Sequence, residues 1–179
     1  MSRLSFAFTI ITMLVSNVAQ AQGWIEFEDR TWGVSINFPH EPIAQDFEYI
    51  SYYQRAVPAR VYSAEEGTGR YVLTIVSFAS DQTDSLTAQW HASEAIRAKG
   101  EVTYFGFQDL DGIPGLLISV TEPDGRLIQA CVYFVAQRLY IAEGSIAAGN
   151  PPPSNFQQSI SIIDATGERI ILDDDVFFP

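Results

Sequence analysis

Apolar and polar residues alternate with a period of two along much of this chain, which is typical of β-strands with one buried face. Residues 34–38 (VSINF) show the alternation clearly, and Pro39 and Pro42 then prevent the strand from continuing. Residues 71–78 form an apolar, β-branched run of strand length. The same criteria predict further strands at residues 57–64, 101–107, 115–121, 127–136 and 139–144, and a last short strand at 170–172.

The connections between these segments are short and rich in turn residues. Asp111-Gly112 and Asp124-Gly125 are pairs that tolerate the positive φ of tight hairpin turns, and residues 65–69 are predicted to form another hairpin loop. Because short links join antiparallel neighbours, the sheet is predicted to be mainly antiparallel.

A helical period replaces the alternation at residues 85–99. Asp84 or Ser85 can cap this helix, and Gly100 stands where glycine commonly ends helices. Its buried stripe is predicted to consist of Leu86, Trp90, Ser93 and Ile96, flanked by Ala88, Ala92 and Ala95. A second, shorter helix is predicted at 154–161, after three prolines. The predicted fold class is therefore α/β of the α+β type: one domain with a mainly antiparallel sheet of about six to eight strands, with the long helix and the short C-terminal helix packed on it.

The first 21 residues have the features of a secretory signal peptide. Arg3 precedes an apolar run at 4–15, and Ala19-Gln20-Ala21 provides small residues at the −3 and −1 positions of a cleavage site. The run is too short to span a membrane, and no cysteine follows it to carry a lipid. We therefore expect residues 22–172 to form a single exported domain, periplasmic in a Gram-negative source, with no stable membrane anchor and an acidic tail at 173–179.

The chain is strongly acidic, with a formal net charge of −12. Such a surface repels phosphate backbones and anionic lipid headgroups, which argues against nucleic acid as a partner. Cys131 is the single cysteine, so no intramolecular disulfide can form. It lies in an apolar strand-like run, where a cysteine usually behaves as a small hydrophobic residue.

The sequence contains no convincing set of reactive residues. His40-Glu41 lacks the second histidine of a zinc-binding helix, and His91 is interpreted as a solvated helix residue. Asp109 and Asp111 resemble the start of a calcium loop, but the later ligands are missing. We therefore expect no catalytic, cofactor-binding or metal-binding residue, no cofactor, and no enzyme activity.

One aromatic and basic segment, at residues 47–60, is a candidate interaction surface. Tyrosine and arginine are favoured at recognition surfaces because they supply contact area and a polar group at low entropic cost. Strand alternation predicts Phe47, Tyr49 and Tyr53 on one face and Tyr52 on the other; which face is buried stays open, as does the alternative that these aromatics only cover the sheet. The candidate residues are Tyr49, Tyr52, Tyr53, Arg55 and Arg60.

The order of these elements resembles the PsbP-like fold, known from an extrinsic subunit of photosystem II and a Ran-binding import factor. The opening Val34-X-Ile36-X-Phe38-Pro39-X-X-Pro42 and the late Arg138-Leu139-Tyr140-Ile141-X-Glu143-Gly144 carry the resemblance. The set is also similar to uncharacterised exported proteins of alphaproteobacteria, over roughly residues 24–172. These are packing and turn motifs, so no functional residue of the family can be assigned here.

The resemblance implies an exported accessory or binding protein that acts by protein–protein interaction with an unknown partner. The alternative is a periplasmic small-molecule-binding protein, and an enzyme is the least favoured class. A deep cavity would favour a small-molecule ligand, whereas an exposed aromatic patch would favour a protein partner.

Overall fold

The computed structural model describes residues 23–81 and 83–172. The predicted signal peptide, the cleavage site and the acidic tail lie outside these residues. Within them, two antiparallel sheets and two helices form the α+β fold that the sequence predicts. The helices are α1 (Ser85–Arg97) and α2 (Ser154–Gln158).

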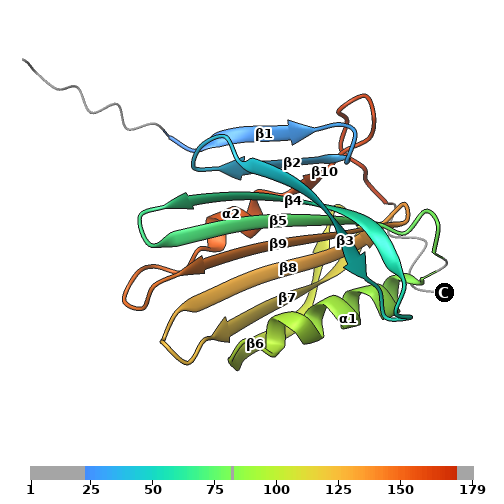
Figure 1. Ribbon diagram of the computed structural model, residues 1–179. Helices are drawn as coiled ribbons and strands as arrows, with labels where there is room; N and C mark the ends of the chain where they lie inside the picture. Colours follow the sequence, from blue (N-terminus) through green and yellow to red (C-terminus); the bar gives the residue numbers. More distant parts are fainter. Residues whose placement is uncertain (1–22, 82, 173–179) are drawn as a thin grey trace, which may run out of the picture.

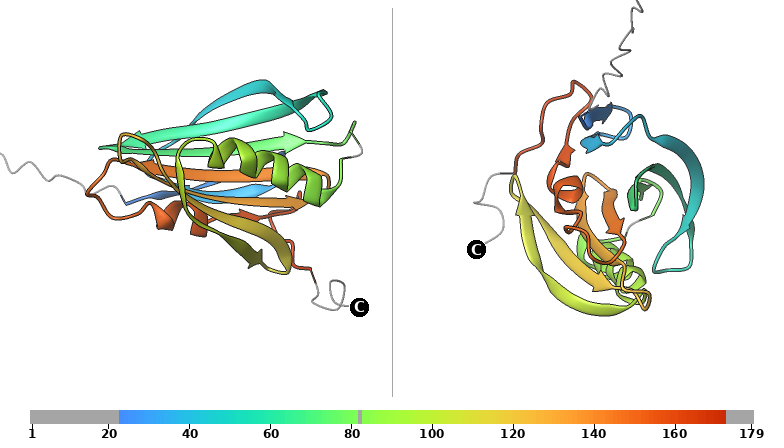
Figure 2. Two further views of the ribbon diagram at one scale, coloured as in Figure 1. Left: turned by 90° about the horizontal axis from the view of Figure 1, so that it is seen from below. Right: turned by 90° about the vertical axis from the view of Figure 1, so that its left-hand side faces the viewer.

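The large sheet has seven strands in the order β3-β4-β5-β9-β8-β7-β6, and each neighbouring pair in it is antiparallel. It is twisted and curved, and α1 lies across one side of it (Figures 1 and 2). Its strands are β3 (Ile43–Ile50), β4 (Ala56–Glu66), β5 (Gly69–Ser77), β6 (Glu101–Leu110), β7 (Ile113–Thr121), β8 (Leu127–Val135) and β9 (Arg138–Ile146).

A separate three-stranded sheet in the order β1-β2-β10 was not predicted. It consists of β1 (Ile25–Asp29), β2 (Val34–Phe38) and β10 (Ser161–Ile162), all antiparallel. Strand 34–38 is confirmed, but it pairs within this small sheet. Strand β1 (IEFED) alternates apolar and acidic residues, but it is short and mostly exposed or half-buried, and the sequence analysis did not include it.

Two hydrophobic cores lie on opposite faces of the large sheet. The first core packs that sheet against β2 and α2, and its largest buried side chains include Phe38, Tyr62, Tyr140 and Phe156. The second packs the other face against α1, with Ala88, Ala92 and Ile96 contributed by the helix. Cys131, fully buried in the first core, behaves as the predicted small hydrophobic residue.

Helix α1 is rotated relative to the predicted stripe. Its buried residues are Ala88, Gln89, Ala92, Ser93 and Ile96. Leu86 is 62% exposed and Trp90 is half-buried, so the prediction that both face the core is wrong for Leu86 and only partly right for Trp90. Small side chains let the helix approach the sheet, and buried Gln89 is satisfied by hydrogen bonds from its Nε2 to Ser85 Oγ and the Pro114 carbonyl, each 3.1 Å.

The ends of several elements also differ from the prediction. Helix α1 ends at Arg97, and Gly100 has no positive φ; instead a Cβ there would lie 2.1 Å from the Thr121 carbonyl oxygen, so Gly100 permits a close approach. Helix α2 is shorter than predicted. Residues 170–172 form no strand, because Ile170 N–H donates to Ile162 and Leu172 N–H to Asp111, without a continuous ladder.

The Asp111-Gly112 turn is confirmed as a tight hairpin turn, with φ of 55° and 81°. A Cβ on Gly112 would lie 2.0 Å from the Leu172 carbonyl oxygen, so both the backbone angle and the close approach require glycine. The sequence predicts that Ala136 ends the strand at 127–136. It lies instead, with Gln137, in the turn between β8 and β9, where both residues have a positive φ.

Two leucines provide a test of this packing. Leu73 is fully buried in the first core, whereas Leu86 is largely exposed on α1. Leu73→Ala should lower the free energy of unfolding by about 2–5 kcal/mol, because it removes buried methyl groups and leaves a cavity. Leu86→Ala should change it by less than about 0.5 kcal/mol. Denaturant titration of both variants measures the difference, and equal losses would contradict the observed rotation of α1.

Candidate functional site

The turn between β3 and β4 carries most of the predicted interaction residues. Strand β3 ends at Ile50, and Ser51–Arg55 form a closed turn in which Ser51 N–H donates to the Arg55 carbonyl at 2.8 Å. Gln54 adopts a positive φ of 59°, which closes the turn. We call residues 51–55 the aromatic hairpin tip.

A buried carboxylate fixes the aromatic hairpin tip to the body of the protein. Ser51 Oγ donates to Asp81 Oδ2, and Arg55 Nη1 donates to Asp81 Oδ1, each at 3.1 Å. The Asp81 side chain is 2% exposed, whereas that of Arg55 is 64% exposed. Asp81 is distant in sequence from the tip, so sequence analysis did not identify it as a positioning residue.

The tip presents two tyrosine rings to solvent. Tyr52 is 56% exposed and Tyr53 is 50% exposed, and their rings meet edge to face with centroids 5.3 Å apart. Because the strand ends before them, the predicted alternation does not apply to Tyr52 and Tyr53. Both belong to one exposed turn.

Tyr49 precedes the tip and is half-buried. Its ring packs against Phe78 and against His91 of α1, with centroid distances of 6.4 and 5.9 Å. His91 Nε2 lies 3.1 Å from the Ile50 carbonyl oxygen as a hydrogen-bond donor, so β3 and α1 hold each other at this corner. Burial raises the pKa of Tyr49 to about 12.

Arg60 lies apart from the other candidates. It points to the opposite face of the sheet, where its guanidinium binds Asp46 through Nε and Nη2 at 2.6 and 2.8 Å and lies over the Trp32 ring. Hydrogen bonding to Asp46 raises the pKa of Arg60. The structure therefore brings Tyr52, Tyr53 and Arg55 together and separates Arg60 from them.

A second exposed apolar region lies on β6, an edge strand of the large sheet. Phe107 is 78% exposed and Tyr104 is 50% exposed. Beside it on α1, Trp90 stacks on Phe105 with ring centroids 5.3 Å apart, and Arg97 lies over both rings. Sequence analysis missed this region because the position of β6 at the edge of the sheet depends on the pairing of distant strands.

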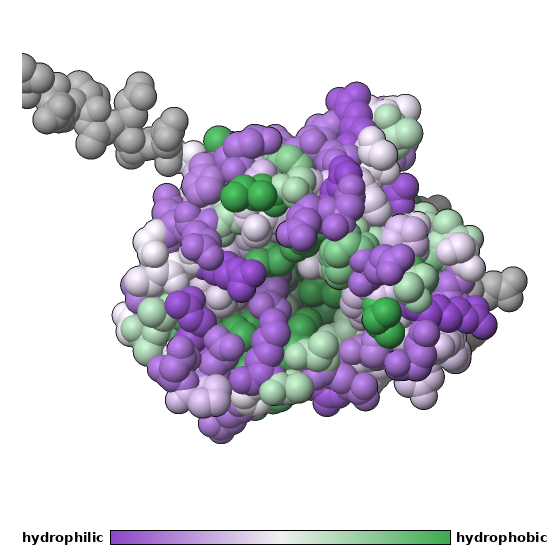
Figure 3. Space-filling model, viewed as in Figure 1, coloured by the Kyte–Doolittle hydropathy of each residue, from purple (hydrophilic) through white to green (hydrophobic). Residues whose placement is uncertain are grey.

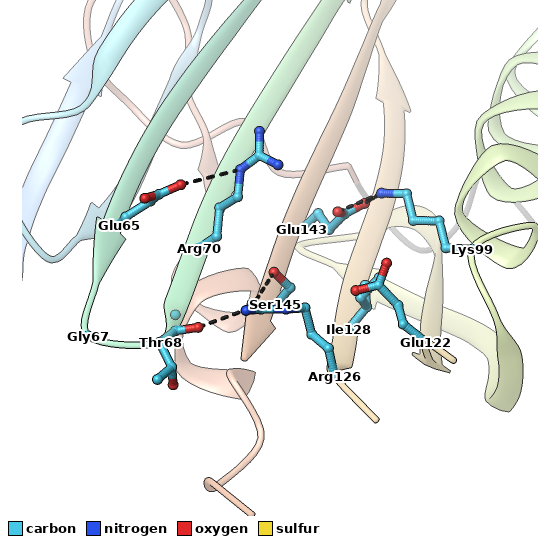
Figure 4. Close-up of a pocket in the computed structure, with 11 residues that line it drawn as sticks. Glu65, Gly67, Thr68, Arg70, Lys99, Glu122, Arg126, Ile128, Glu143 and Ser145 are labelled. Carbon is cyan, nitrogen blue, oxygen red and sulfur yellow. Dashed lines mark hydrogen bonds and ion pairs between the residues drawn. The ribbon is translucent and has the colours of Figure 1, made fainter. Parts of the chain in front are cut away.

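The α1 face of the molecule is mostly hydrophilic, with a hollow between β3 and α1 (Figure 3). Toward the β4–β5 and β7–β8 turns, a polar cleft of about 540 Å³ opens on this face. Figure 4 shows acidic and basic side chains converging on it from several elements. We call it the polar cleft; its lining includes Glu65, Arg70, Lys99, Glu122, Arg126, Ile128, Glu143 and Ser145.

The reactive groups of the chain do not form a catalytic arrangement in the part that the structure describes. Burial raises the pKa of the Cys131 thiol to about 12, so the thiol stays neutral at physiological pH. Both ring nitrogens of His40 bond backbone carbonyls, of Glu41 and Glu65. Among residues 23–81 and 83–172, no three His, Cys, Asp or Glu side chains are grouped to hold a metal ion. Over the same residues, no helix has the length and apolarity to cross a membrane.

The antiparallel sheet with helices on its faces is a PsbP-like fold. A solved structure with this fold is the solution structure of cyanobacterial PsbP (CyanoP) from Synechocystis sp. PCC 6803. The two structures superpose with a TM-score of 0.51 and 15% sequence identity, over 79% of this chain and 93% of the cyanobacterial one. No protein-family model matches the chain, and no curated protein matches it in sequence. The likeness establishes the fold and assigns no functional residue.

The partial burial of Tyr49 predicts a pH dependence of stability. The pKa of Tyr49 is about 12 in the folded state and about 10 in the unfolded state. Its contribution to stability is therefore fully present below about pH 10 and is lost as the pH rises toward 12. At pH 11 the wild type should have lost about 1 kcal/mol relative to Tyr49→Phe, compared with their difference at pH 8. Denaturant titrations at the two pH values measure this change, and parallel curves would contradict the burial of the hydroxyl group.

Proposed function

We propose that this protein is an exported accessory or binding protein that acts by contact with another protein, without catalysis. The aromatic hairpin tip is the observation that carries this proposal. Two exposed tyrosines and an exposed guanidinium stand together on a turn, and such side chains are enriched where proteins recognise each other.

The anchoring of the tip supports a binding role. Ser51, Arg55 and Asp81 connect the turn to the protein body, so its backbone is ordered before a partner arrives. A surface that is already ordered loses less conformational entropy on binding, and the released free energy appears as affinity. Arg55 pairs with Asp81, and its exposed guanidinium can also donate hydrogen bonds to a carboxylate of the partner.

The surroundings of Cys131 and His91 are those of structural residues, which supports a non-catalytic role. The thiol of Cys131 is buried and neutral, and the imidazole of His91 is used to hold the Ile50 carbonyl. The PsbP-like fold agrees with an accessory function.

Export to the periplasm is part of this proposal. The composition of residues 1–21 predicts cleavage after Ala21, which leaves Gln22 as the first residue of the mature protein. Intact-mass measurement of the protein recovered from the periplasmic fraction of its source cells should give the mass of residues 22–179. Recovery of the full-length mass from the membrane fraction would contradict both cleavage and location.

The contact surface can be tested with the double variant Tyr52→Ala/Tyr53→Ala. Neither tyrosine side chain hydrogen-bonds to another described residue, and Arg55 is retained so that buried Asp81 keeps its charged partner. The tagged variant should unfold at the wild-type temperature, but recover at least about tenfold less of the partner from periplasmic extract, as expected when two hot-spot aromatics are removed. Quantitative mass spectrometry of the co-purified proteins measures the loss.

Phe107→Ala is the matched control, because it removes an exposed aromatic ring from β6, at the edge of the large sheet opposite to β3. It should retain the partner at the wild-type level. Loss of the partner in the control but not in the double variant would move the contact surface to β6. If the wild type and both variants recover the same proteins equally, the proposed role of the tip is wrong.

A further inference from the structure

The polar cleft lies at the opposite end of β4 from the aromatic hairpin tip. The β4–β5 turn, the β7–β8 turn, β9 and the residues after α1 contribute its walls (Figure 4). Ile128, which is 2% exposed, is the one large apolar side chain among the described lining residues. The cleft therefore offers charge and hydrogen bonds to a ligand and little apolar contact.

Two of the three cations in the cleft already have acidic partners. Lys99 Nζ lies 2.5 and 2.6 Å from the two carboxylate oxygens of Glu143. Arg70 Nε lies 4.0 Å from Glu65 Oε1, in a looser and exposed pair. These pairs neutralise the charges of Lys99, Glu143, Arg70 and Glu65. Arg126 and Glu122 are the other charged residues among the described residues that line the cleft.

Arg126 is held in position by neutral groups. Its Nη1 donates to the Thr68 carbonyl at 3.0 Å and lies 3.5 Å from Ser145 Oγ. Over residues 23–81 and 83–172, no carboxylate lies within 4 Å of its guanidinium. Ser145 is buried, and its hydroxyl group donates to no other described residue, so its proton can be donated to an anion. A guanidinium fixed in this way is suited to binding a carboxylate through its remaining N–H groups.

Glu122 stands at the start of the same turn as Arg126. The backbone N–H of Glu122 donates to the Arg126 carbonyl at 2.9 Å, yet the two side chains do not pair with each other. In Figure 4 the Glu122 carboxylate points toward the Lys99–Glu143 pair, whereas the Arg126 side chain extends toward Thr68 and Ser145. In the described part of the chain, Glu122 has no cation within 4 Å. One turn thus presents two opposite, unpaired charges to one cleft.

We propose that the polar cleft binds a small zwitterion of the α-amino-acid class. The carboxylate of the ligand binds Arg126 and Ser145, and its ammonium group binds Glu122. The polar walls favour a polar side chain on the ligand. This site is independent of the proposed protein contact, because it uses other residues at the other end of the large sheet.

The charge pattern also explains why a zwitterion is favoured over a simple anion. Glu122 faces the same cleft as Arg126 and has no cation within 4 Å in the described part of the chain, so it repels a ligand that brings only negative charge. An ammonium group on the same ligand removes that repulsion and adds a charged hydrogen bond. Discrimination between an amino acid and its deamino analogue should therefore depend on Glu122.

The test is a nuclear magnetic resonance titration of the mature protein, labelled with ¹⁵N, with each of the twenty common amino acids. At least one should shift backbone amide signals of Gly69, Arg126 and Ser145 in a saturable way, with a Kd between about 0.1 and 10 mM, the range expected for a ligand of this size. Arg126→Gln should weaken this binding at least tenfold. The Glu122 carboxylate makes no hydrogen bond to another described residue, so Glu122→Gln should leave the fold intact. This variant should reduce the preference for the amino acid over its deamino analogue at least fivefold.

Arg30→Gln is the control, because it removes one positive charge from an exposed pair with Glu28 outside the cleft. It should leave the affinity unchanged. If no amino acid shifts the amide signals of the cleft residues at a ligand concentration of about 20 mM, the proposal is wrong. It is also wrong if Arg126→Gln and Arg30→Gln weaken binding equally, or if Glu122→Gln leaves the discrimination intact. The recovery of a partner protein by the tip variant tests the proposed function alone, so its outcome does not affect this test of the cleft.

Discussion

Burial of the large sheet on both of its faces is the constraint on which the rest of the structure depends. The central strands β5, β8 and β9 have a core on each side, so apolar residues at both odd and even positions are removed from water. Each face then needs its own cover, provided by α1 on one side and by the small sheet with α2 on the other. Within the large sheet, the edge strands β3 and β6 are the most exposed to solvent, with aromatic and charged residues.

The sequence predicts most of the local structure of this fold, because periodicity and turn chemistry are local properties. The segment at 34–38, the Asp111-Gly112 turn and the existence of α1 could all be recognised in this way. The small sheet could not, since its pairing depends on contacts between β2 and the distant β10. The rotation of α1 also depended on a distant group, the Pro114 carbonyl that receives the hydrogen bond of Gln89.

The candidate sites show the same division between local and distant information. The enrichment of tyrosine and arginine near residue 52 is visible in the sequence, and the exposure of Tyr52 and Tyr53 agrees with it. The anchoring by Asp81 and the departure of Arg60 to the other face depend on tertiary contacts. The polar cleft had no sequence signal at all, because Thr68, Arg126 and Ser145 come from three different elements.

The edge strand β3 has a consequence for how copies of this protein meet. An open strand edge is a template for pairing with another chain. Here the edge carries Asp46 and Glu48 on a strand whose residues are almost all exposed. Asp46 is paired with Arg60, so Glu48 and the net charge of −12 on each chain oppose an edge-to-edge approach of two copies. The acidity of the chain therefore disfavours pairing of two copies through this border of the sheet.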